Sequence, residues 1–177
     1  GQIQSLRTQQ IDSLDSIQIA ALTSQNILGL TVEQVAAINL TSMVGLETGD
    51  LAAMSSIQLG AFTTGQVAQL SSGQVAALSS ANIKGLNTSQ IGAISSNAIA
   101  GLESRDLNAL SPEQVAGFTS AQWLAFSASQ IAALTSRQLA AVRTAQVSGF
   151  SSEVIQALTS SNIAGLSNAQ IASISEA

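Results

Sequence analysis

The sequence contains no cysteine, no histidine and no tyrosine, and it has a single proline. Without cysteine there is neither a disulfide framework nor thiol chemistry. Histidine is the commonest general base and metal ligand in proteins, so the many serines lack their usual catalytic partner. The acidic side chains are scattered along the chain. We therefore expect no catalytic residue, no cofactor-binding residue and no metal site, and we interpret the chain as not an enzyme.

Charge is also scarce. Only 8% of residues are charged, against about 25% in a typical domain, and ten acidic against five basic residues give a net charge of −5. The basic residues are Arg7, Lys84, Arg105, Arg137 and Arg143. They are too few and too widely separated to bind a phosphate backbone, which dominates nucleic-acid affinity. We expect no nucleic-acid partner.

Long apolar runs are absent although 46% of residues are hydrophobic. Polar residues interrupt every stretch well before the roughly 18 apolar residues that a membrane-spanning helix needs. The first residues, Gly1 to Gln4, are not a basic region followed by an apolar segment, so we expect no signal peptide in this segment. The sequence predicts no membrane span.

What the chain has instead is an octad repeat. Two columns of this octad are apolar in all 22 copies. The first column comprises Ile3, Ile11, Ile19, Ile27, Val35, Met43, Leu51, Leu59, Val67, Val75, Ile83, Ile91, Ile99, Leu107, Val115, Trp123, Ile131, Leu139, Val147, Ile155, Ile163 and Ile171. The second lies three positions later in each octad, from Leu6 and Leu14 to Leu166 and Ile174, and contains every phenylalanine.

The polar and small columns are almost as regular. Gln precedes the first apolar column in 14 copies, and Ala or Gly precedes the second in 18. Ser, Thr, Asn or Asp follows the second column in 18 copies. The consensus octad is Ser/Thr, Ser, any residue, Gln, Ile/Val, Ala, Ala/Gly, Leu.

This octad predicts one short helix per repeat. In one continuous helix the apolar pair would rotate by about 80° with every octad, and in a regular strand the two columns would point to opposite faces. Residues three apart share a face of a short helix. Ser71-x-x-Gln74 and Thr135-x-x-Gln138 match the capping box at a helix start, and Pro112 falls on the first helical position, where proline is favoured.

A single octad buries too little to fold alone, so successive helices must stack. We expect residues 1–177 to form a single all-α solenoid, a superhelix of about 22 short helices cut from a longer array. Gly85, Gly101 and Gly117 are separated by multiples of two octads. That spacing favours four helices, and therefore four octads, per turn, although Gly29 and Gly45 fall on the opposite phase.

Two acidic pairs, Glu47/Asp50 and Glu103/Asp106, have capping-box spacing. Carboxylates are favourable at a helix start, and a calcium loop needs more closely spaced oxygen ligands. We interpret both pairs as helix caps.

Phe118, Trp123 and Phe126 occupy core columns and predict a bulkier core layer. Leu28, Val44 and Leu124 fall in a column that elsewhere contains polar residues. We expect these three side chains to be exposed, where they could form a contact surface.

The octads resemble known arrays. Leu70-Ser71-Ser72-Gly73-Gln74-Val75-Ala76-Ala77-Leu78 and Ser127-Ala128-Ser129-Gln130-Ile131-Ala132-Ala133-Leu134 are similar to octapeptide repeats of very large bacterial secreted and surface proteins, adhesin-like or RTX-type. This resemblance implies an extracellular or cell-surface location. A shorter likeness, Leu110 to Ala116, resembles the opening of a transcription-activator-like effector repeat, but the base-reading loop of that family is missing.

The sequence thus favours a non-enzymatic spacer or scaffold of a secreted or cell-surface bacterial protein, whose partners are the neighbouring repeats. The alternative is an adhesion module that binds a surface protein or a glycan through its repetitive face. A third possibility, an ice-binding array, is disfavoured because Arg7, Glu47, Glu103 and Arg143 interrupt the Ser/Thr column.

Overall fold

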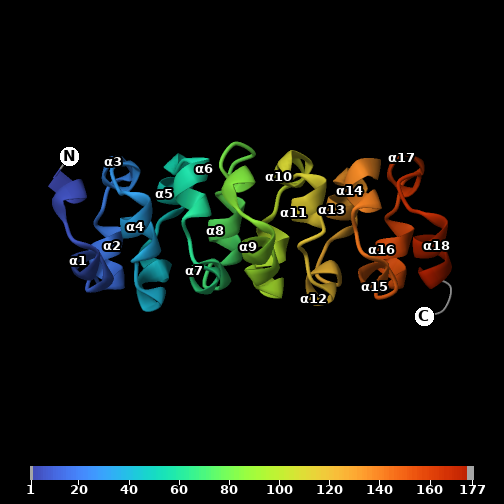
Figure 1. Ribbon diagram of the computed structural model, residues 1–177, viewed down its shortest axis with the longest axis horizontal. Coiled ribbons are helices and arrows are strands. Elements are labelled where there is room, and N and C mark those ends of the chain that lie inside the picture. The colour runs from blue at the N-terminus through green and yellow to red at the C-terminus, as the bar shows by residue number, and fades with distance from the viewer. Residues whose placement is uncertain (1, 175–177) are drawn as a thin grey trace.

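The computed structural model describes residues 2–174 and is all-helical over that range. It contains one short helix for each octad, and the ribbon advances steadily from the N-terminal to the C-terminal end (Figure 1). The predicted solenoid of about 22 short helices is confirmed. Among residues 2–174, no helix is long and apolar enough to cross a membrane.

Every helix is brief, most of them between one and two turns long. The first nine α-helices are α1 (Thr8–Asp12), α2 (Ser16–Ala20), α3 (Ser24–Leu28), α4 (Val32–Ala36), α5 (Thr48–Ala53), α6 (Ser56–Gly60), α7 (Thr64–Ala68), α8 (Ser72–Ala76) and α9 (Thr88–Ala93). The other nine are α10 (Ser104–Ala109), α11 (Pro112–Val115), α12 (Ser120–Trp123), α13 (Ala128–Ala133), α14 (Ser136–Ala140), α15 (Thr144–Val147), α16 (Ser152–Gln156), α17 (Ser160–Ile163) and α18 (Asn168–Ile174). Four 3₁₀ helices complete the series: η1 (Gln2–Ser5), η2 (Leu40–Gly45), η3 (Ile83–Gly85) and η4 (Ser96–Gly101).

Each helix is short because both of its ends are specified within the octad. The cap residue is extended, as at Ser71 (φ −73°, ψ 165°), and its hydroxyl accepts the backbone N–H of Gln74. Pro112 begins α11, as predicted. The second apolar residue then returns to extended backbone, as at Leu110 (φ −69°, ψ 143°), and stops the helix. This alternation of helical and extended backbone turns the chain at every repeat.

Both apolar columns line a continuous core. Nearly every first-column residue from Ile11 to Val147 is fully buried, and the second column from Leu30 to Phe150 is 7% exposed or less. These residues form one hydrophobic cluster along the length of the solenoid. Burial of these columns is the main stabilising contribution of each repeat.

Successive turns of the solenoid, which we call coils, are staggered. Helix α7 packs against η2, which lies three octads earlier, while Gln66 of α7 bonds to α4, which lies four octads earlier. Bonds between coils join side chains to carbonyls that lie 28 to 31 positions earlier at most octads. One turn therefore takes about three and a half octads. It is shorter than the four octads that the glycine spacing predicted.

Two such turns contain seven octads, and the sequence has a longer repeat of this length. Residues without an amide side chain stand in the Gln column at this interval: Ser42, Ala98 and Val154. One octad later, Asp50, Asp106 and Asn162 follow with the same interval. The helices η2 and η4 also begin seven octads apart. Seven octads, which make two turns, are thus the full repeating unit.

The seven-octad unit also relates glycines of the two phases. Gly45 and Gly101 are one unit apart, as are Gly29 and Gly85. A Cβ at Gly101 would overlap the carbonyl oxygen of Ser72 in the preceding coil. None of the glycines in the described part of the chain has a positive φ. Gly45, Gly85, Gly101 and Gly165 are needed for close approach of the coils, since a Cβ there would overlap a backbone carbonyl oxygen of another coil.

Gly101→Ala should therefore destabilise the solenoid by about 1–3 kcal/mol, because a methyl group is forced into a closely packed backbone contact. Gly73→Ala is the matched control, since a Cβ there meets nothing within 4 Å. It should raise stability by about 0.4–1 kcal/mol by restricting the unfolded chain. Chemical denaturation followed by circular dichroism measures both. Equal effects of the two substitutions would contradict the close-approach explanation.

Candidate functional site

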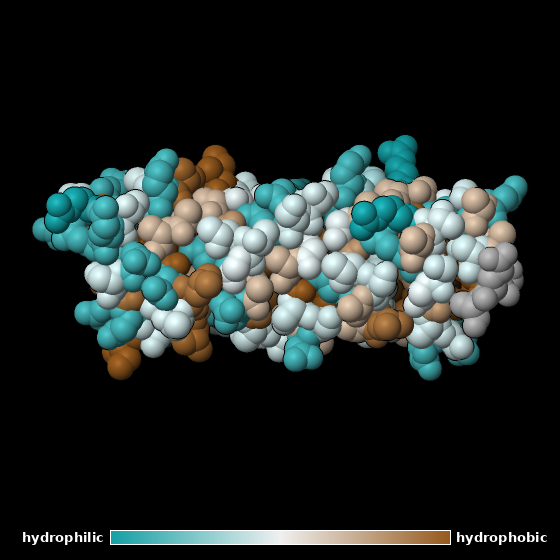
Figure 2. Space-filling view, turned by 60° about the horizontal axis from the view of Figure 1, so that its bottom comes forward, coloured by the Kyte–Doolittle hydropathy of each residue, from teal (hydrophilic) through white to brown (hydrophobic). Residues whose placement is uncertain are grey.

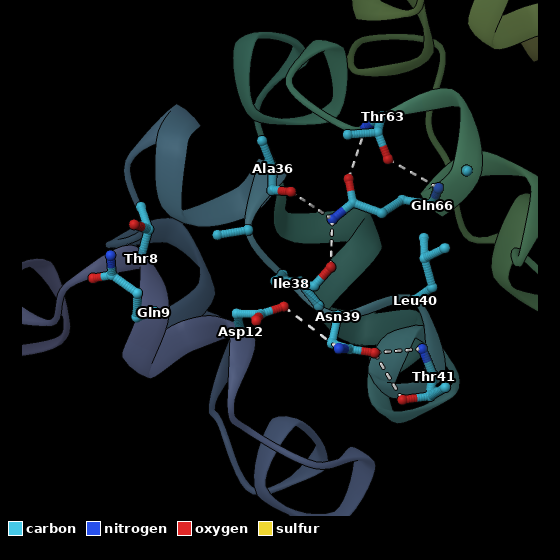
Figure 3. Close-up of a pocket in the computed structure, with 12 residues that line it drawn as sticks. Thr8, Gln9, Asp12, Ala36, Ile38, Asn39, Leu40, Thr41, Thr63 and Gln66 are labelled. Atoms are coloured by element: carbon cyan, nitrogen blue, oxygen red, sulfur yellow. Dashed lines mark hydrogen bonds between the residues drawn. The ribbon is translucent and has the colours of Figure 1, made fainter.

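The most regular polar arrangement in the structure is the column of glutamines at the starts of the helices. At α7 the side-chain Oε1 of Gln66 accepts the backbone N–H of Thr63 (2.7 Å), and Thr63 Oγ1 accepts the backbone N–H of Gln66 (3.1 Å) (Figure 3). This is the predicted capping box. It satisfies two amide groups that a helix start otherwise leaves unpaired.

The other end of the same amide bonds to the preceding coil. Gln66 Nε2 donates to the carbonyl oxygens of Val35 (2.9 Å) and Ile38 (2.8 Å), which lie at and just beyond the last turn of α4. The side chain is 1% exposed. One buried amide therefore forms hydrogen bonds with backbone groups at the start of its own helix and at the end of a helix one coil earlier.

The same bridge recurs along the solenoid. The amides that donate to backbone carbonyls of the preceding coil belong to Gln34, Gln58, Gln66, Gln74, Asn82, Gln90, Gln114, Gln122, Gln130, Gln138, Gln146, Asn162 and Gln170. Together they form a ladder of hydrogen bonds that links each coil to the next, which we call the amide ladder.

The octad pattern predicts the capping role of these glutamines but not their bonds to the preceding coil. A signal was nevertheless present. A capping box accepts Glu or Gln equally, yet this column contains 14 glutamines and no glutamate. A glutamate would place acceptor oxygens against carbonyl oxygens, whereas the glutamine amide has N–H groups to donate. The preference for an amide over a carboxylate indicates a second, accepting partner.

The two acidic pairs lie at interruptions of the amide ladder. Asp50 is buried, accepts the backbone N–H of Glu47 (3.3 Å) and accepts the hydroxyl of Ser24 in the preceding coil (3.1 Å). The hydroxyl supplies the proton that a glutamine amide supplies elsewhere. For this pair the predicted capping contact is present.

The second pair is arranged differently. Asp106 is 1% exposed, and neither of its carboxylate oxygens has a hydrogen-bond partner. Arg105 pairs with Glu103 (3.0 Å) and lies 3.7 Å from Asp106 Oδ1. Burial raises the pKa of Asp106, an effect opposed by the charge of Arg105 and reinforced by that of Glu103. The predicted side-chain capping contact is missing from this pair.

For three exposed glutamates in the first turns of helices, the pKa is shifted in the opposite direction. The pKa values of Glu33, Glu113 and Glu153 are lowered because each carboxylate accepts its own backbone N–H and the hydroxyl of the cap residue. Negative charge is favourable at this end of a helix. These residues strengthen the caps at neutral pH.

The aromatic residues form the bulky core layer that the sequence predicted. Phe118 and Trp123 are fully buried, and Trp123 packs against Phe126 and Phe150 with both ring centroids 5.1 Å away. The Nε1 hydrogen of Trp123 has no acceptor. This cluster fills the solenoid interior and does not form a binding site.

Exposed hydrophobic side chains concentrate toward the N-terminal end, which is the left half of the molecule in Figure 2. Leu28, Val44 and Leu124 are 51%, 75% and 60% exposed, as expected from their column. Ile17 and Ile57 are also exposed, from positions where other octads carry polar or small residues. Their exposure has no structural explanation within the fold.

An open groove of about 690 Å³ lies across three successive coils near this end. Leu40 and Ala36 contribute apolar surface, and Thr8, Asp12 and Asn39 contribute polar groups (Figure 3). Asn39 Nδ2 donates to Asp12 Oδ1 across the groove (3.4 Å). The groove combines apolar and hydrogen-bonding surface, and its lining contains one carboxylate, that of Asp12.

Residues 2–174 contain no group of three acidic side chains that could hold a metal ion. The serines have no histidine partner anywhere in the sequence. Hydroxyls such as those of Ser71 and Ser111 are used as helix caps.

Comparison with known proteins supports a repeat protein. The ALTTAQ repeat family model matches residues 43–80 and 99–136. The two matched stretches begin seven octads apart, at the same point of successive two-turn units. The chain is thus similar to this repeat family over both stretches. No curated protein matches the chain.

The amide ladder makes a direct prediction at Gln66. Gln66→Glu keeps the acceptor for Thr63 but turns carboxylate oxygens toward the carbonyls of Val35 and Ile38, so it should destabilise the protein by roughly 2–4 kcal/mol at neutral pH. Gln10→Glu is the control, because Gln10 is exposed and its side-chain oxygen accepts the backbone N–H of Arg7 without a bond to another coil.

The control substitution should change stability by less than about 0.5 kcal/mol. Urea denaturation monitored by circular dichroism compares the two variants. If Gln66→Glu were as mild as Gln10→Glu, the bonds between coils would not contribute to stability.

Proposed function

We propose that this array is a non-enzymatic structural spacer of a secreted or cell-surface bacterial protein. The observation that carries this proposal is the amide ladder. It fixes each coil to the one before it, so that the length of the solenoid is set by the number of repeats. A continuous core and sparse charge suit a stiff element that holds other parts of a protein apart.

The absence of histidine and cysteine from the sequence and the use of serine hydroxyls as caps support a non-enzymatic role. The secreted or surface location rests on the resemblance of the octads to arrays of bacterial secreted and surface proteins.

A specific observation favours one alternative, an adhesion module that binds a protein or a glycan. The groove at Leu40 has no copy one unit later in the sequence, because Ser96 and Ser152 stand where Leu40 does. A binding site that occurs once in an array is typical of a module with one partner. A spacer needs no such local difference.

Length is the first test of the spacer. A second copy of residues 83–138 inserted after Gln138 adds one complete two-turn unit and keeps every column in register. With coils packed about 8–10 Å apart, small-angle scattering should show a maximum dimension about 16–20 Å larger. Melting temperature should not fall. An unchanged dimension or a collapsed particle would contradict the proposal.

The alternative is tested by Leu40→Ser, which copies the residue found two turns later. For a spacer, attachment of the protein to glycan-coated or protein-coated surfaces should be unchanged by Leu40→Ser. A large loss of attachment, with circular dichroism unchanged, would favour the adhesion module over the spacer.

A further inference from the structure

Asp106 is the one buried carboxylate in the described residues whose oxygens both lack a hydrogen-bond partner. It occupies the Gln column of α10, at the interface with the preceding coil, and is 1% exposed. A buried ionised group without a hydrogen bond is strongly unfavourable. Its position within a regular ladder of donors makes this arrangement unusual.

The repeat register shows what Asp106 faces. Side chains of this column bond to carbonyls 31 and 28 positions earlier, as Gln130 does to Ile99 (2.8 Å) and Leu102 (2.7 Å). For Asp106 the same offsets give Val75 and Leu78. The carboxylate therefore stands where every amide of the ladder donates a hydrogen to a carbonyl oxygen.

The equivalent residues of the neighbouring units form hydrogen bonds that Asp106 lacks. Asn162, one unit later, donates to the carbonyl of Ile131 (3.0 Å). Asp50, one unit earlier, accepts the Ser24 hydroxyl (3.1 Å). Asp106 has neither bond, although Ser80 stands at the offset of Ser24. The preceding octad carries Ala98 in the column, so two successive octads contribute no amide donor.

Few charges act on Asp106. Arg105 lies 3.7 Å away with its side chain 66% exposed, and Glu103 is the N-cap residue of the same helix. Of the elements that pack on α10, α13 has no titratable side chain and η3 has only Lys84, which is exposed. Helix α8, opposite in the register, has none. The state of Asp106 is thus governed by burial and by the carbonyls of the preceding coil.

We propose that Asp106 is a proton-dependent joint between two coils of the solenoid. When protonated, its carboxyl O–H donates to a carbonyl oxygen of the preceding coil, at Val75 or Leu78, and completes the amide ladder. When ionised, it places a buried negative charge against those oxygens and weakens the contact between the coils.

The sign of the pH dependence follows from the direction of the titration. The pKa of Asp106 is raised by burial above the ordinary aspartate value of about 3.9. The folded chain therefore binds this proton more tightly than the unfolded chain. The stabilisation that protonated Asp106 provides is fully present below the pKa that this residue has in the unfolded chain. It is lost as pH rises through the higher pKa that Asp106 has in the folded chain. Glu33, Glu113 and Glu153 change stability in the opposite direction, so the test must compare variants at each pH.

Two reciprocal substitutions isolate the joint. Asp106→Asn supplies the donor that Asn162 supplies naturally. Asn162→Asp places a carboxylate in the next unit, where it still accepts the backbone N–H of Thr159 but, when ionised, can no longer donate to the carbonyl of Ile131. At pH 7, amide hydrogen exchange in α10 should be roughly tenfold slower in Asp106→Asn than in the natural chain, and this difference should vanish in acid. Asn162→Asp should make amide hydrogen exchange in α17 faster at pH 7. In acid the exchange rate should return to that of the natural chain.

Carboxyl ¹³C chemical shifts of the unaltered protein follow the titration of Asp106 directly, even where a variant folds poorly. A titration above the ordinary range of aspartate supports the joint. A titration at or below that range would overturn it. So would exchange profiles of Asp106→Asn and the natural chain that remain parallel from acid to neutral pH.

Discussion

The structure depends on one interaction, the glutamine amide that bonds in two directions. Its oxygen accepts the backbone N–H of its own cap residue, and its nitrogen donates to carbonyls of the preceding coil, as at Gln66. Short helices leave most of their backbone groups without internal partners. An octad helix would therefore be full of unpaired polar groups, and the amide satisfies groups at two helix ends at once.

This constraint fixes the geometry of the superhelix. The amide reaches carbonyls 28 and 31 positions back, and side-chain length permits little variation in that offset. A turn of about three and a half octads follows, and each helix then lies between two helices of the preceding coil. Because the turn is not a whole number of octads, equivalent surroundings recur only after two turns. The seven-octad unit is the consequence in the sequence.

Much of this fold could be predicted from the sequence because its determinants are local. The caps at Ser71 and Thr135, the start at Pro112 and the two apolar columns all act within one octad. The partners of the amide ladder are backbone carbonyls, which every residue has, so the preference for an amide indicates that an acceptor exists but not where it lies. The glycine spacing predicts the wrong turn length because it follows multiples of two octads, whereas the true period is seven octads, as at Ser42, Ala98 and Val154.

At some interruptions of the ladder, close packing joins the coils instead. At η4 a glycine brings the backbones together: Gly101 abuts Ser72, and Ala98 takes the place of the glutamine. At this octad, van der Waals contact substitutes for the amide bridge. Elsewhere the two occur together, since Gly85 abuts Ser56 in the octad where Asn82 donates to the preceding coil. Asp106 follows in the next octad, where no amide donor has returned. The solenoid is therefore held by amide bridges and close backbone packing along most of its length, and at Asp106 a single ionisable side chain controls the contact between the coils.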